Sequence, residues 1–369
     1  MRNSEQKRLV LALSIQRIPF LRSDEKLLLW DLVDDELSLS VLLSRDVEAA
    51  IGRGLGERPW TPDSYLEAAV RDAVYLERSG CRFIHFDDGG YPEALRETSR
   101  PPFGLFARGT PLSSGARSVA IVGTRLPTGR GLASAFELSS GLAEAGVTVI
   151  SGLAKGIDSA AHRGAMAGFR SARSARSGPE SGTCAILPCG IDAVYPPGNR
   201  RLAQEILEEG GLLLSEYPPG EEIRKYRFPE RNRIIAGMSR ACVVVEAPAK
   251  SGALITAEHA LDEGRDVWVS LPCLGGPRSA GIDRLAAEGA PVAGSAADIL
   301  ADWGLASSGA EVAGARAAQA RDRWARGAEG EGARLASSLF DELSAGPSGV
   351  PGEPVSSLAA RATLDRRIE

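Results

Sequence analysis

The segment from Arg224 to Arg240 concentrates positive charge in a chain whose formal net charge is −5. It contains six basic residues and one acid: Arg224, Lys225, Arg227, Arg231, Arg233 and Arg240 against Glu230. At its centre, residues 228–236 predict a short loop with one aromatic ring that continues into an apolar, helix-like pattern. A local positive field beside an aromatic ring is typical of a site that binds phosphate-bearing ligands.

A glycine-containing turn follows the first apolar run of the central region. Val122-Gly123-Thr124-Arg125 ends that run, and residues 128–131, Thr-Gly-Arg-Gly, then open a helix-like pattern. The backbone N–H groups of such a turn can face an anion together with Thr124, Arg125 and Arg130. The turn lacks a Walker lysine and a complete dinucleotide fingerprint, so tight strand-to-helix geometry is the structural alternative.

Two further turns repeat this design. Residues 151–158, Ser-Gly-Leu-Ala-Lys-Gly-Ile-Asp, follow the next apolar run, and Lys155 adds a point charge. Residues 247–256 combine small residues and hydroxyls with Lys250 at another helix start. A single nucleotide needs one such turn. A nucleic-acid strand needs several phosphate contacts and an aromatic platform such as Phe228 or Tyr226, although core packing is the alternative for Phe228.

Residues that could carry out a reaction are few. Asp158 and His162 are four positions apart on a predicted helix and could form an acid–base pair, but helix capping and a local hydrogen bond explain them as well. Glu246 and Glu258 are the acids best placed for hydrolysis, with structural roles as the alternative. The histidines and cysteines have no metal-ligand spacing, and no nucleophile is evident, so we expect no metal, no cofactor and no catalysis.

The elements that position these residues follow from the pattern between Ser118 and about Trp303, where short β-branched runs alternate with helical patterns. The expected strands are Val119–Val122, Val147–Ile150, Cys184–Leu187, Leu212–Leu214, Cys242–Val245 and Val267–Val269. This order predicts an α/β fold with a doubly wound, mostly parallel sheet. Because ligand loops lie outside the carboxyl ends of such strands, the three turns should meet at one edge.

The remaining segments predict further domains. Apolar residues at helical spacing predict a helical domain over residues 1–80, and chain breakers predict a connector over 81–115 ahead of the main domain at 116–303. Residues 170–178, rich in serine and arginine, predict a surface insertion. A shift to alanine, glycine, arginine and glutamate predicts a flexible linker over 304–334 and a weakly ordered tail over 335–369.

Composition limits the class of protein. The 369 residues, 43% of them apolar, can form one large core with smaller appended domains. An isoelectric point near 5.6 excludes a protein that coats nucleic acid over its whole surface, so a polyanion must bind at a patch. Five scattered cysteines favour reduced thiols in the cytoplasm. The apolar run from Leu9 to Leu21 is interrupted by Gln16 and Arg17, so we expect neither an export signal nor a membrane span.

Taken together, these segments resemble the DprA family of bacterial DNA-processing proteins, also called Smf. The resemblance runs from about Phe83 to Leu300. The motifs that carry it are Tyr91-Pro92, Val119–Arg125, Ser151–His162, Tyr195-Pro196 with Asn199, Ser215–Pro218, Phe228–Ala236, Glu246-Ala247, Ser251–Ala257 and Gly289-Ala290.

The resemblance implies a non-enzymatic protein with a Rossmann-like core that binds single-stranded DNA. It also implies that the protein loads the RecA recombinase onto incoming DNA during natural transformation and homologous recombination, and that it forms a homodimer. The DNA-binding residues that the resemblance implies are Gly123, Thr124, Arg125, Ser151, Gly152, Lys155, Lys225, Phe228, Arg231, Asn232, Arg233, Lys250, Ser251, Gly252 and Thr256.

At the two ends, the resemblance implies a sterile-alpha-motif-like N-terminal domain and a truncated winged-helix-like C-terminus. Two other functions compete with the leading one. A nucleotide-binding enzyme of the phosphoribohydrolase type has a similar sheet, but its Pro-Gly-Gly-x-Gly-Thr-x-x-Glu loop differs from Lys250–Glu258, which has one glycine and another threonine-to-glutamate interval. A protein-interaction scaffold with a vestigial pocket is the third interpretation.

Overall fold

The computed structural model describes residues 2–112, 115, 117–172 and 182–305. The expected linker and C-terminal tail therefore lie outside the described residues from position 306 onward. Of the serine- and arginine-rich stretch, residues 170–172 belong to a helix, and the rest also lies outside the described residues.

Within the described residues, nine strands form one sheet in the order β1-β2-β6-β5-β4-β3-β7-β8-β9. The strands are β1 (Arg82–His85), β2 (Gly104–Gly109), β3 (Ser118–Val122), β4 (Thr148–Ser151), β5 (Thr183–Leu187), β6 (Leu212–Ser215), β7 (Ala241–Val244), β8 (Asp266–Ser270) and β9 (Val292–Ala293). In the order in which they lie in the sheet, all neighbouring strands from β6 to β9 are parallel. Strand β2 is antiparallel to both of its neighbours, β1 and β6. All six predicted strands are present, so the expected α/β fold with a mostly parallel sheet is confirmed.

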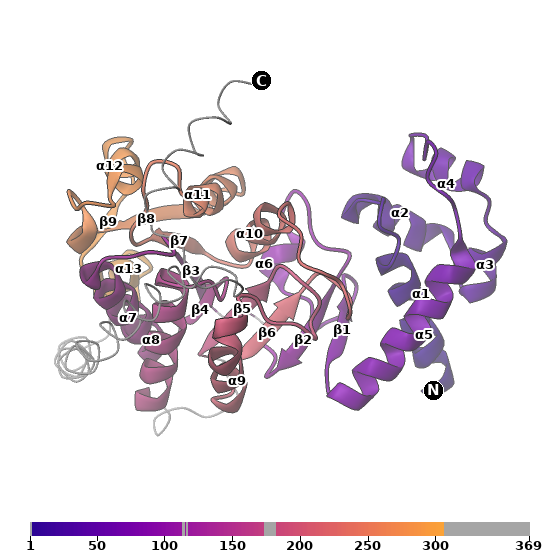
Figure 1. The fold of residues 1–369 in the computed structure, drawn as a ribbon, viewed down its shortest axis with the longest axis horizontal. Helices are drawn as coiled ribbons and strands as arrows, with labels where there is room; N and C mark the ends of the chain where they lie inside the picture. Colours follow the sequence, from indigo (N-terminus) through magenta and orange to yellow (C-terminus); the bar gives the residue numbers. More distant parts are fainter. Residues whose placement is uncertain (1, 113–114, 116, 173–181, 306–369) are drawn as a thin grey trace, which may run out of the picture. The chain divides into compact units, whose positions relative to one another are not determined.

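The central strands are buried on both faces. Every residue of β3, β4, β5, β6 and β7 is buried, which is why these runs are mainly apolar rather than alternating. Helices α7 (Gly129–Glu144), α8 (Ile157–Ala172) and α9 (Arg200–Glu208) cover one face, and α10 (Arg227–Gly237) and α11 (Gly252–Asp262) cover the other (Figure 1). Helices α12 (Ala280–Ala287) and α13 (Ala296–Asp302) follow β8 and β9.

The direction in which strands are added to the sheet reverses between β3 and β7. From β3 the chain adds β4, β5 and β6 on one side, then crosses over through α10 and adds β7, β8 and β9 on the other. Right-handed crossovers in opposite directions place the helices on opposite faces. The loops after β3 and β7 therefore diverge and leave a crevice at the carboxyl ends of these strands, the usual ligand position in such sheets.

Residues 81–115 differ from the predicted connector, because they contain β1, β2 and the short helix α6 (Glu93–Arg96). Leu105, Phe106 and Ala107 of β2 are fully buried, and β2 pairs with β6. The chain breakers in this range shape the turns around α6 rather than separate two domains. Sequence patterning missed the strands because they are only four and six residues long.

The N-terminal helical region is confirmed. Its helices are α1 (Arg2–Gln16), α2 (Ser23–Leu32), α3 (Glu36–Val41), α4 (Ser44–Ile51) and α5 (Pro62–Ser79). They enclose a separate hydrophobic cluster that includes Ile15, Leu29, Leu39 and Val47. The likeness to a sterile-alpha-motif domain stays a prediction. None of the described helices is long and apolar enough to cross a membrane, and all five cysteines are buried free thiols.

Candidate nucleic-acid interface

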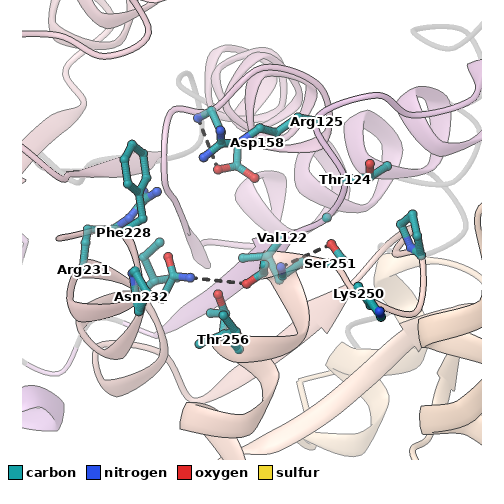
Figure 2. Close-up of a pocket in the computed structure, with 18 of the residues that line it drawn as sticks. Val122, Thr124, Arg125, Asp158, Phe228, Arg231, Asn232, Lys250, Ser251 and Thr256 are labelled. Carbon is teal, nitrogen blue, oxygen red and sulfur yellow. Dashed lines mark hydrogen bonds between the residues drawn. The ribbon is translucent and has the colours of Figure 1, made fainter. Parts of the chain in front are cut away.

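A cavity of about 460 Å³ lies at the carboxyl ends of β3 and β7, where the strand order reverses. Its walls come from the loop after β3, one face of α10 and the turn between β7 and α11 (Figure 2). We call it the switch-point cavity. Ten of the fifteen predicted site residues line it: Gly123, Thr124, Arg125, Phe228, Arg231, Asn232, Lys250, Ser251, Gly252 and Thr256.

A second cavity of about 270 Å³ adjoins the first and shares Arg125, Ala154, Phe228 and Arg231 with it. Its other lining residues include the predicted Gly152 and Lys155 and the segment Tyr195–Pro197. We call it the Tyr195 cavity. Twelve of the fifteen predicted residues therefore line one of two neighbouring cavities.

The spacing along α10 decides which side chains reach these cavities. This helix begins at Arg227, so Phe228 and Pro229 lie in its first turn and not in the loop that the sequence suggested. Proline is tolerated there because the first N–H groups of a helix have no intrahelical partner. Residues three and four apart share a helix face, and Phe228, Arg231, Asn232 and Ile235 accordingly line the switch-point cavity.

The Phe228 ring stands between the two cavities. Its ring lies edge-on to Tyr195, with centroids 5.5 Å apart and an interplanar angle of 70°. The Arg125 guanidinium carbon lies 5.2 Å from the centre of the Phe228 ring. Phe228 is only half-buried and belongs to none of the three hydrophobic clusters of the described residues. Its surroundings fit a stacking platform better than the core-packing alternative.

Arg231 lines both cavities together with Phe228. Its side chain is buried, 4% exposed, and Nη1 donates to the backbone oxygen of Ile186 over 2.8 Å. A Cβ at Gly152 would lie 1.7 Å from the same nitrogen, so glycine is needed there for the guanidinium to pass. Burial lowers the pKa of Arg231 to about 10, which leaves the side chain charged at neutral pH.

Asp158 and His162 do not form the acid–base pair weighed from their spacing. Asp158 accepts hydrogen bonds from the backbone N–H groups of Gly152 and Ala154, and burial raises the pKa of its carboxyl. The His162 ring is fully buried and bonds Thr183 through Nδ1 over 2.8 Å. Burial lowers the pKa of His162 to about 3, so the ring is neutral and does not gain a proton near neutral pH.

Glu246 occupies the position at the start of α7 where the sequence suggested that an anion could bind. Its carboxylate accepts from the backbone N–H of Thr128 over 2.8 Å, just ahead of the helix. A Cβ at Gly131 would lie 2.2 Å from Glu246 Oε2, so the carboxylate lies directly against the first turn. An internal carboxylate thus takes the place that a nucleotide phosphate has in dinucleotide-binding folds.

The start of α11 differs from that of α7, because the residues at the start of α11 line the switch-point cavity. Ser251 caps the helix by accepting from the N–H of Ala253, and Gly252 beside it is exposed. The Asn232 amide donates to the oxygen of Gly252 over 3.4 Å and joins α10 to this turn (Figure 2). Lys250, one residue ahead of the cap, is exposed. A helix N-terminus beside a lysine suits a phosphate group.

Charge in the two cavities is predominantly positive. Their cationic lining residues are Arg125, Lys155, Arg231 and Lys250, against the single acid Asp158, which is engaged by backbone N–H groups. Among the residues that the structure describes, no group of three or more histidines, cysteines and carboxylates could hold a metal ion. The arrangement can bind anionic groups and stack an aromatic one.

Three predicted residues line neither cavity. The Ser151 hydroxyl is buried and donates to the oxygen of Ile121, which ties β4 to β3. Lys225 is exposed ahead of α10. Arg233 lies on another face of α10, where its guanidinium binds both carboxylate oxygens of Glu216 at 2.5 and 2.6 Å and the oxygen of Arg100 at 2.7 Å.

Tyr195 is the main site residue that was not among the predicted set. It lies 33 residues ahead of Phe228 in the sequence, so no local periodicity connects the two rings. A usable signal was its place in a proline- and glycine-rich turn that follows β5, since loops after parallel strands gather at the ligand edge.

Comparison with known proteins places these features in a family. The profile of the family described as DNA recombination-mediator protein A matches residues 82–304. Over 195 residues the chain is 44% identical to the protein Smf of Synechocystis sp., which covers 52% of this chain and 46% of that protein. The match therefore spans less than half of that relative. The DNA processing protein DprA of Bacillus subtilis is 34% identical over 292 residues, covering 79% of this chain and 94% of that protein.

Two solved structures are similar to the described fold. The X-ray structure of DNA processing protein A from Streptococcus pneumoniae has a TM-score of 0.61 at 32% identity, covering 78% of this chain and 95% of that chain. DNA processing protein A from Helicobacter pylori has a TM-score of 0.51 at 26% identity, covering 60% of this chain and 95% of that chain. That second structure was determined for insight into a unique single-stranded DNA binding mode.

Proposed function

This chain belongs to the DNA recombination-mediator protein A family, also called DprA or Smf, and we propose that it binds single-stranded DNA in its two adjoining cavities. The observation that carries the proposal is the Phe228 ring, half-buried between the cavities with the Arg125 guanidinium 5.2 Å from its centre. A ring flanked by cations fits a polymer whose bases stack while its phosphates seek positive charge.

Each part of the site has a role in this proposal. A base stacks on Phe228, and the phosphate on one side meets Lys250 with the exposed start of α11. The phosphate on the other side meets Arg125 and Lys155, which line the Tyr195 cavity. Because these contacts reach the backbone and ring faces and not base edges, we expect little sequence preference.

Arg231 and Gly152 act indirectly in this proposal. The Arg231 guanidinium is buried against Ile186 and contributes charge at a distance rather than a direct contact. Gly152 provides the space through which that guanidinium passes. Arg233 is neutralised by Glu216, so we propose no phosphate contact for it, in contrast to the expectation from the family motif.

We propose no chemical step at this site. His162 and Asp158, which the sequence suggested as an acid–base pair, are committed to Thr183 and to backbone N–H groups. The Glu246 carboxylate fills the phosphate position at α7 that a nucleotide-hydrolysing enzyme of this fold would need. Turnover of a nucleoside monophosphate by the purified protein would contradict this part of the proposal.

Loading of RecA onto the bound strand and formation of a homodimer belong to the same proposal and rest on the family. Together they describe a mediator that acts in the cytoplasm during transformation and homologous recombination. A RecA test uses a strand coated with single-strand binding protein. Addition of this chain should shorten the delay before RecA hydrolyses ATP, and an unchanged delay would remove RecA loading from the proposal. Sedimentation equilibrium tests the dimer.

Ultraviolet crosslinking tests the site itself. After irradiation of the complex with oligothymidylate and proteolysis, we expect crosslinked peptides that contain Phe228 or Tyr195. Crosslinks confined to the N-terminal helices α1–α5 would place the strand elsewhere and contradict the assignment. Crosslinking to the Phe228→Leu variant serves as the control, since it should lose the Phe228 crosslink and keep that at Tyr195.

A further inference from the structure

Leu153 has an unusual backbone conformation in the loop between β4 and α8. Its φ is +55°, and among the described residues it is the one residue other than glycine with a positive φ. This left-handed region is unfavourable for a bulky residue because its Cβ comes too close to the following carbonyl oxygen. A residue remains there only where its surroundings hold it, and such residues cluster at functional sites.

Three side chains hold this loop. Asp158 binds the N–H groups of Gly152 and Ala154, and the Ser159 hydroxyl donates to the oxygen of Ala154 over 2.7 Å. Asp158 and Ser159 belong to α8, the helix that the loop enters. The Asn199 amide comes from elsewhere in the chain and donates to the oxygen of Leu153 over 2.8 Å and to Ser159 Oγ over 3.1 Å.

Asn199 lies outside both cavities but adjoins two segments that line the Tyr195 cavity. It is 9% exposed and lines neither cavity. Its side chain binds the loop that carries Lys155, two residues beyond Leu153. Its backbone follows the segment Tyr195–Pro197, which also lines this cavity.

The amide is not needed for the local structure of its own segment. Asn199 ends the 3₁₀ helix η2 (Pro197–Asn199), and its backbone N–H already donates to the oxygen of Pro196 over 2.9 Å. The whole hydrogen-bonding capacity of the Asn199 Nδ2 group is directed at the Leu153 loop and at the serine that holds it. The side chain thus fixes the distance between two segments that are separated by some forty residues of sequence.

We propose that Asn199 is a positioning residue for DNA binding. Its amide holds Leu153 in the left-handed conformation and thereby keeps Lys155 at the lining of the Tyr195 cavity. This inference rests on the proposed binding of single-stranded DNA, because Lys155 matters only if a phosphate meets it. Without the amide, the loop relaxes and Lys155 is no longer held at the Tyr195 cavity.

The direct test is Asn199→Asp, which keeps the size of the side chain but turns an oxygen toward the Leu153 carbonyl. We expect roughly tenfold weaker binding of oligothymidylate, the effect of losing about 1.4 kcal/mol of binding free energy. We also expect faster hydrogen exchange of the amides from Gly152 to Ile157 in the protein without DNA. Asn199→Ala removes the amide without adding charge, and tests the same claim if the first variant does not fold.

A matched control removes a comparable hydrogen bond away from the site. The buried Tyr91 hydroxyl donates to the oxygen of Pro102 over 2.8 Å and lines neither cavity. The Tyr91→Phe variant should lose stability but bind the strand with unchanged affinity. A general effect of weakened packing would instead reduce affinity in both variants.

A double-mutant cycle separates positioning from a merely structural role. If Asn199 acts through Lys155, the losses in Asn199→Asp and Lys155→Ala combine to less than their sum, whereas those of Asn199→Asp and Lys250→Ala add. Normal affinity and exchange in the Asn199 variants, or additivity with Lys155→Ala, would overturn this inference alone. Wild-type protein that does not bind the strand would overturn the proposed function and this inference with it.

Discussion

Phe228 is the aromatic platform of the proposed site, so its replacement is the clearest test at the scale of single residues. Phe228→Ala should weaken oligothymidylate binding by about 1–3 kcal/mol, the range found for bases stacked on aromatic side chains. Because the ring lies outside the hydrophobic clusters, the melting temperature should change little. Fluorescence anisotropy and thermal denaturation measure the two effects.

Phe228→Leu separates stacking from volume, since leucine fills much of the space without a π face. We expect it to bind nearly as weakly as the alanine variant. Full affinity in the leucine variant would show that volume, and not stacking, is what the strand requires. A large loss of stability in Phe228→Ala would return the ring to a packing role.

Arg125 is the cation placed to contact phosphate from both cavities. On a single strand, each phosphate contact contributes about −0.7 to the slope of log affinity against log salt concentration. Arg125→Ala should therefore make the slope shallower by about this amount for every sequence tested. Arg130 is the matched control, because it is also exposed and near the start of α7 but lines neither cavity. Equal slopes in the two variants would contradict the assignment of Arg125.

His162 makes stability depend on pH. Its pKa in the folded protein is about 3, below the ordinary value of 6.5, so the unfolded chain binds a proton first as the solution is acidified. The contribution of the neutral His162 ring to the free energy of unfolding is therefore intact above pH 6.5. It is lost as the pH falls toward 3, at up to about 1.4 kcal/mol per pH unit. His162→Gln, which has no such proton, should show a shallower decline in urea unfolding measured across this range. Parallel curves for the two proteins would contradict the buried, neutral ring.

Secondary-structure elements explain how far the sequence could predict the site. The six central strands were predictable because double burial favours continuous apolar runs, and the position of the loops followed from the parallel order. The face of α10 that lines the cavities could not be predicted in the same way, because the sequence suggested a loop where the helix already begins at Arg227. On this helix Arg233 pairs with Glu216, although it stands next to Arg231 and Asn232 in the sequence motif.

Tertiary contacts set the other limits of prediction. Nothing near Glu246 in the sequence shows that its carboxylate lies against the start of α7, since Thr128 is 118 residues away. Tyr195 and Asn199 were visible as a motif, but their contacts with Phe228 and Leu153 depend on how β5, α8 and α10 pack. Local sequence patterns indicate which face of an element is buried, but they do not indicate which residues far apart in the sequence come into contact.

The start of α7 offers a prediction at the scale of elements. Glu246→Gln keeps a hydrogen-bond acceptor near Thr128 but removes the negative charge at the helix N-terminus, so unfolding should become easier by about 1 kcal/mol. Because Glu246 lines neither cavity, the affinity for oligothymidylate should not change. Chemical denaturation and anisotropy check both statements. Markedly tighter DNA binding would show that the carboxylate competes with a phosphate for α7, and would extend the site to that helix.

At the scale of the whole molecule, one negatively charged chain holds a confined positive site. The net charge of −5 disfavours binding over the general surface, while the two cavities collect Arg125, Lys155, Arg231 and Lys250. The helical region and the sheet could both be predicted from apolar periodicity. The two strands within residues 81–115 could not, because they are short and flanked by chain breakers.

The central claim is that this site binds a single strand by stacking and charge, and anisotropy with labelled oligothymidylate and a matching duplex across a salt titration tests it most directly. We predict tighter binding of the single strand at every salt concentration, with an affinity that falls as salt rises, because a duplex hides its base faces from Phe228. Equal affinity for both, or no binding of the single strand at low salt, would contradict the account.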